Sequence, residues 1–100
     1  MSINEEESTL ELPPASIWNN ICKIALTEDK PIMLDYWADS LEKKVVIGVK
    51  ENKEKLLVKN SEEYTSPIAK IFKMDNVYII CTENSLYLAS SSIESRKISS

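Results

Sequence analysis

From residue 32 onward, the chain consists of short apolar runs rich in β-branched and aromatic residues, separated by polar connectors. Runs of roughly four to eight such residues between turn-forming residues are typical of β-strands. Most connectors are short enough for hairpins, whereas strands paired in parallel need crossovers of about a dozen residues or more. The sequence therefore predicts an antiparallel meander of five to six strands, at 32–37, 44–50, 55–59, 66–74, 77–82 and 86–89.

A single helix is predicted before the strands. At about 100° per residue, the apolar side chains of residues 15–27 fall on one continuous arc, and the polar side chains fall on the other side. Pro13 and Pro14 precede this segment, and proline is tolerated in the first turn of a helix. The expected fold class is α+β, with an N-terminal amphipathic helix packed on the meander. The meander would form either a curved sheet or a small half-open barrel.

The apolar runs differ in a way that distinguishes central strands from edge strands. Residues 45–49 and 77–81 are almost continuously apolar, which suits central strands that are covered on both faces. The run Leu56-Leu57-Val58 lies between lysines, and such charges are common on exposed edge strands.

The charge of the chain is concentrated at its start. Four glutamates before residue 13 account for the formal net charge of −4, because acidic and basic side chains balance in the rest of the chain. Segments without apolar periodicity that carry a run of like charge favour disorder. We expect a flexible acidic leader at 1–12, a single α+β domain at 13–90 and a serine-rich tail at 91–100.

Two observations bear on the location of the protein. No apolar run approaches the roughly 18 to 20 residues of a membrane-spanning helix, and the acidic N-terminus does not match a secretory signal. Cys22 and Cys81 each lie within an apolar segment, which predicts two buried thiols that stay reduced. We expect a cytoplasmic, intracellular protein with no membrane contact. A bias toward Ile, Lys and Asn favours an A/T-rich coding sequence, as in many viruses, phages and low-GC bacteria.

Most residue patterns that support catalysis are missing from the sequence. The chain has no histidine, so Ser-His and Cys-His nucleophile pairs are excluded. Its one glycine, Gly48, lies within a predicted strand and not in a phosphate-binding loop. Two isolated cysteines do not match a zinc site. A carboxylate pair such as Asp35 and Asp39 remains open in principle. We expect no enzymatic activity, no cofactor and no metal.

The segment Leu34–Ser40, LDYWADS, interleaves acidic and aromatic residues. In a strand that runs to residue 37, Asp35 and Trp37 would share one face and Tyr36 would lie on the other. An exposed Trp37 would be the first choice for a contact residue. A Trp37 beneath the helix would place Asp35 in the interior, where it would need a partner.

A second candidate feature is a mild excess of lysine over glutamate between residues 41 and 59. The excess is smaller than the basic stripe of a typical nucleic-acid-binding protein. Together, the two features define the predicted contact surface, which consists of Trp37, Asp35, Lys44, Lys50, Lys55 and Lys59.

Two functions are compatible with these features. The first is a small non-enzymatic protein-interaction module, which would bind a protein partner or a second copy of itself through its sheet. The alternative is a single-stranded nucleic-acid-binding β-domain, in which a lysine-rich hairpin contacts phosphates and exposed aromatic rings stack on bases. The candidate stacking platforms are Tyr36, Trp37, Tyr64 and Phe72. The single arginine and the acidic leader disfavour the alternative.

Overall fold

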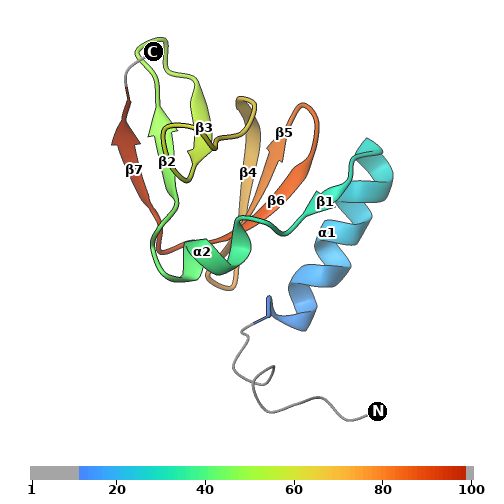
Figure 1. Cartoon of the computed structure of the whole chain (residues 1–100). Coiled ribbons are helices and arrows are strands. Elements are labelled where there is room, and N and C mark those ends of the chain that lie inside the picture. Colours follow the sequence, from blue (N-terminus) through green and yellow to red (C-terminus); the bar gives the residue numbers. More distant parts are fainter. Residues whose placement is uncertain (1–11, 99–100) are drawn as a thin grey trace.

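The computed structural model describes residues 12–98, and within them it contains two helices and seven strands (Figure 1). In chain order these are α1 (Ala15–Glu28), β1 (Ile32–Met33), α2 (Trp37–Leu41), β2 (Val46–Val49), β3 (Lys55–Val58), β4 (Ile68–Met74), β5 (Val77–Thr82), β6 (Leu86–Ser90) and β7 (Glu94–Lys97). The predicted α+β class is confirmed. Except for Leu12, the predicted acidic leader lies outside the described residues.

The strands form two mixed sheets, which do not close into a barrel. Sheet A has the order β1-β6-β5-β4, and sheet B has the order β3-β2-β7. Strands β4, β5 and β6 pair antiparallel, as do β2 and β3. However, β1 pairs with β6 in parallel, and β2 pairs with β7 in parallel. The prediction of antiparallel pairs alone is therefore wrong at these two places.

The parallel pairs have a simple physical explanation. The crossover requirement applies to parallel strands that are neighbours in the sequence. Here the partners are distant in the sequence, so the intervening strands and loops serve as the connection. Strand β7 also lies in the segment that the sequence analysis assigned to the serine-rich tail, and its Glu94 pairs with Val46 of β2.

The core has two layers, separated by sheet A. On one face, Ile79 of β5 and Leu88 of β6 pack with Ile17 and Ile21 of helix α1. On the other face, Ile80 packs against residues of sheet B, in a cluster that comprises Tyr36, Val45, Ile47, Leu57, Ile80, Ala89 and Ile93. Strand β5 is therefore covered on both faces, which explains its unbroken apolar sequence. Figure 1 shows the resulting order of α1, sheet A and sheet B.

Helix α1 matches its predicted segment closely. It ends at Glu28, and Asp29 follows in the left-handed conformation with φ 57°, where its N–H donates to the carbonyl of Ala25. Such a left-handed residue is a common helix terminus. The prediction that both cysteines are buried is wrong for Cys22, which is exposed, whereas Cys81 is buried. Among residues 12–98, neither helix is long and apolar enough to cross a membrane.

Helix α2 occupies a segment where a strand end and a turn were predicted. Trp37, Ser40 and Leu41 have the spacing of one helical face, and Trp37 and Leu41 pack in the cluster beneath α1. The fully buried hydroxyl of Ser40 donates to the carbonyl of Trp37 at 2.6 Å and accepts from the N–H of Ser90 at 2.8 Å. This pair of hydrogen bonds attaches α2 to the end of β6.

The helix also changes the positions of the two residues that were expected to share a strand face. Strand β1 ends at Met33, so strand alternation does not apply to Asp35 and Trp37. Trp37 is only 7% exposed and packs in the core, whereas Asp35 is exposed. The proposed role of Trp37 as a surface contact residue is therefore incompatible with its burial. Asp35 does not need the buried partner that the strand interpretation required.

Trp37 and Asp35 provide a direct test of this arrangement. Replacing Trp37 by Ala removes a large buried side chain, so we expect the free energy of unfolding to fall by about 3 to 5 kcal/mol. Asp35→Ala, at an exposed position, should change it by no more than about 0.5 kcal/mol. Urea denaturation of both variants measures the difference. Similar small losses in the two variants would contradict the burial of Trp37.

Candidate functional site

The predicted contact residues do not form a single surface. Trp37 lies in the core. Lys59 and Lys44 both contact Asp39 of helix α2, Lys59 by an ion pair at 3.3 Å and Lys44 through its backbone N–H. Lys50 lies just beyond the last residue of β2, and Lys55 is the first residue of β3. These last two residues therefore belong to the opposite end of the β2–β3 hairpin.

Lys59 has a structural role in this arrangement. Its side chain is 18% exposed, and its ammonium lies 4.8 Å from the centre of the Tyr36 ring while it pairs with Asp39. A cation over an aromatic face is attracted by the electron density of the ring. Tyr36 in turn packs edge-on against Tyr87, with ring centres 5.4 Å apart. Lys59 thus connects the end of β3 to helix α2.

The burial of Tyr36 alters its ionisation. Loss of solvation raises the pKa of its phenol to about 12, and the negative charge of Asp35 adds to the shift. In the unfolded chain a tyrosine titrates near the ordinary value of 10.0. Between these two pH values the folded state therefore holds a proton that the unfolded chain releases. Consequently, the contribution of this group to stability is complete below pH 10 and is lost as the pH rises toward 12.

Replacing Tyr36 by Phe tests this effect. The variant has no phenol to titrate, so we expect its free energy of unfolding to fall less than that of the wild type as the pH rises from 10 to 12. Chemical denaturation at a series of alkaline pH values measures the difference between the two proteins. Tyr64→Phe, at an exposed position, is the control. Parallel pH profiles for wild type and Tyr36→Phe would contradict the assignment.

The side chains of Lys44 and Lys55 make few stabilising contacts. Lys44 pairs with Glu42 at 2.9 Å, and the hydrogen bond with this carboxylate raises the lysine pKa. Both side chains are well exposed, so water screens the attraction. Lys55 is exposed and forms no ion pair with any residue between 12 and 98. Neither lysine lines the two hollows next to Lys50 or the hollow next to α1.

A groove on the outer face of sheet B lies next to Lys50, one of the predicted lysines. It has a volume of about 560 Å³. Because Leu57 points into the core, strand alternation places Leu56 and Val58 on the opposite, outer face. We call this surface the outer groove, and it is lined by Lys50, Leu56, Val58, Asn60, Ser61, Tyr64 and Ile98.

The floor of the outer groove depends on Gly48. A Cβ atom at this position would lie 2.8 Å from Cδ1 of Ile98 and 3.1 Å from Cγ2 of Val58. The missing side chain therefore gives Ile98 the space to lie across β2 toward Val58. The N–H of Ile98 donates to the carbonyl of Val49 at 2.9 Å, which continues the β2–β7 pairing to this residue. The only glycine in the chain thus shapes an apolar floor.

Tyr64 and Asn60 form the opposite side of the outer groove. Tyr64 is 58% exposed and is held by a bridge to Val58. The side-chain oxygen of Asn60 accepts hydrogen bonds from the N–H groups of Glu62 and Glu63, at 2.8 and 3.0 Å. Such a turn fixes the loop between β3 and β4. An exposed aromatic ring is thereby placed beside the apolar floor.

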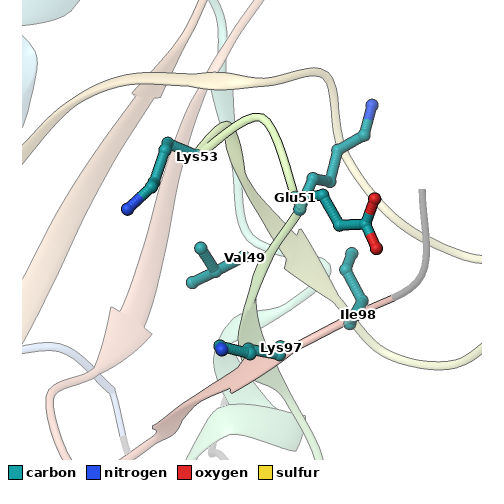
Figure 2. Close-up of a pocket in the computed structure, with 6 residues that line it drawn as sticks. Val49, Glu51, Lys53, Lys97 and Ile98 are labelled. Carbon is teal, nitrogen blue, oxygen red and sulfur yellow. The ribbon is translucent and has the colours of Figure 1, made fainter.

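The end of sheet B next to the outer groove is rich in lysine. A second hollow of about 500 Å³ shares Lys50 and Ile98 with the groove, and is also lined by Val49, Glu51, Lys53 and Lys97. Figure 2 shows Lys53 and Lys97 extending to the same side of β2 as Val49, whereas Ile98 and Glu51 lie on the other side. We call Lys50, Lys53, Lys55 and Lys97 the lysine cluster.

The lysine cluster is only partly neutralised by neighbouring acids. Lys50 pairs with Glu54 at 3.4 Å. Within residues 12–98, Lys53, Lys55 and Lys97 form no ion pair. The arrangement can therefore attract a negatively charged group next to an apolar surface.

Sequence reasoning found part of this site. It identified Lys50 and Lys55, and it named Tyr64 only as a stacking platform of the alternative function, but it did not assign Ile98 to a site. The signal for the floor was present, because Leu56-Leu57-Val58 gives β3 an apolar side chain on each face. The contribution of Ile98 depends on the parallel pairing of β7, which no local pattern indicates. Comparison with protein-family models, curated proteins and solved structures gives no match.

Proposed function

We propose that this chain is a small protein-interaction module without catalytic activity, and that its binding surface is the outer groove. The partner is an extended segment that places an apolar side chain on the floor and an acidic side chain near the lysine cluster. The observation that supports this proposal is one concave surface that combines an apolar floor, the exposed Tyr64 and Lys50, with Lys53 and Lys97 lining the adjacent hollow that shares Lys50 and Ile98.

The chemistry of the lining fits binding better than catalysis. Leu56, Val58 and Ile98 offer apolar contact, and a rigid tyrosine is a frequent anchor of protein interfaces. The amide of Asn60 is engaged with its own loop, where it also donates to the carboxylate of Glu63 at 3.2 Å. No acid and base stand together among the residues that line the outer groove. The lysines supply selectivity and faster association with acidic partners.

Selection from a displayed peptide library tests this proposal. We expect the wild-type chain to enrich peptides with an apolar residue next to Asp or Glu. In Tyr64→Ala the affinity for those peptides should fall by about tenfold or more, because an aromatic anchor contributes on the order of 2 kcal/mol. Fluorescence anisotropy with a labelled selected peptide measures the loss.

Leu34→Ala is the matched control, because Leu34 is an exposed apolar residue outside the outer groove. It should leave peptide affinity unchanged. The shifted NMR signals should map to Leu56, Val58 and Ile98 when the peptide binds. If no peptide family is enriched, or if shifts map away from sheet B, the proposal is wrong.

A second candidate is single-stranded nucleic-acid binding at the same place. Tyr64 beside Lys50 favours it, since a base could stack on the ring while the lysine cluster contacts phosphates. The other expected stacking platforms are less suitable. Tyr36 and Trp37 are buried, and the exposed Phe72 lies on sheet A.

Labelled single-stranded oligonucleotides separate the two candidates. If nucleic acid is the ligand, binding should be measurable at low salt and weaken strongly as salt rises, because phosphate contacts release counterions. The double variant Lys53→Glu, Lys97→Glu should then lose most of the affinity. Lack of binding by the wild type at low salt would eliminate this candidate and leave the peptide proposal untouched.

A further inference from the structure

The longest strand in the described part of the chain, β4, has an open edge. Sheet A ends at β1, which has two residues, and at β4, which has seven. Within residues 12–98, no strand pairs with the outer edge of β4. Open edges of this length offer N–H and C=O groups to another strand. The edge of β3 in sheet B differs, because Tyr64 and Thr65 of the following loop cover it.

The pairing of β4 with β5 is irregular between Ile68 and Lys70, and from Lys70 onward the side chains of β4 alternate between the two faces of sheet A. Lys70 and Phe72 lie on the α1 side of sheet A, where both line a small hollow next to α1. Ile71 points to the other side and packs against the cluster between the sheets. Phe72 is 41% exposed, so a large part of its ring is in contact with water.

We propose that β4 pairs antiparallel with β4 of a second copy, with Ile71 opposite the partner's Ile71. In this register, each Lys70 lies opposite the partner's Phe72. A lysine above an aromatic ring is attracted to it, and directly opposite side chains in a sheet are close enough to interact. Because the pairing is two-fold symmetric, each favourable contact occurs twice.

Neighbouring registers are less favourable. A shift of one residue would set side chains from opposite faces of β4 across from each other, and two-fold antiparallel pairing does not allow this. A shift of two residues places Phe72 opposite the partner's Phe72, but Lys73 then lies opposite the partner's Ile71. Neither lysine meets an aromatic ring in that arrangement. The sequence of β4 therefore complements itself best in the proposed register.

This surface is independent of the proposed function. The β4 edge belongs to sheet A, whereas the outer groove belongs to sheet B. A homodimer through β4 would join the two copies of sheet A into one continuous sheet. Each copy would keep its own outer groove, so two partner segments could bind to one dimer.

Charge variants of β4 test both the dimer and its register. Multi-angle light scattering over a dilution series should give twice the chain mass for the wild type at high concentration. Phe72→Lys places Lys70 opposite a second lysine, so this variant should have the mass of one chain. Adding Lys70→Glu to Phe72→Lys places opposite charges across the pair, and the double variant should recover the dimer mass.

The controls separate dimerisation from folding and from the groove. Met33→Lys makes a comparable change on the other edge strand of sheet A and should remain a dimer, as should Tyr64→Ala. Circular dichroism confirms that each variant is folded. A wild type with the mass of one chain at every concentration would overturn the proposal. So would a folded Phe72→Lys that remains a dimer, or a folded double variant that remains a single chain.

Discussion

The structure depends on the burial of β5 and β6 on both faces. Ile79, Ile80, Leu86 and Leu88 are fully buried, and each such side chain contributes about 1.5 to 3 kcal/mol when it is removed from water. Helix α1 supplies the cover for one face, and sheet B supplies the cover for the other. Helix α2 is attached to the same strands through the buried hydroxyl of Ser40. Sheet A therefore holds the site on sheet B in place, although no residue of sheet A is among those that line the outer groove.

Local patterns predicted the elements whose signals lie within a few residues. Helix α1 has a continuous apolar arc, and β5 coincides with an apolar run typical of a strand covered on both faces. The predicted bounds of both elements therefore agree with the structure to within one residue. Helix α2 was missed because its five residues span little more than one turn. In so short a segment, an aromatic pair followed by Asp and Ser fits the end of a strand and its turn as well as it fits a helix.

The site was less predictable than the fold, for a different physical reason. Lysines near a hairpin are visible in the sequence, and two of the four that were selected lie in the lysine cluster. Trp37 was selected on the assumption of strand alternation, which helix α2 removes. The floor of the groove requires residues of β2, β3 and β7 side by side. Tertiary packing sets this arrangement of strands, and the sequence pattern of a single strand does not indicate it.

The two parallel pairs have a consequence for the order of folding. Strands β4, β5 and β6 are neighbours in the sequence, so their hairpins can close quickly. By contrast, Ile32 meets Leu86 and Val46 meets Glu94 only after long segments have been brought together, and contacts between distant residues slow folding. The meander of sheet A can thus serve as a template on which β1 is added late. We expect sheet B to gain its third strand late in the same way, so that the floor formed by Gly48 and Ile98 is assembled among the final steps.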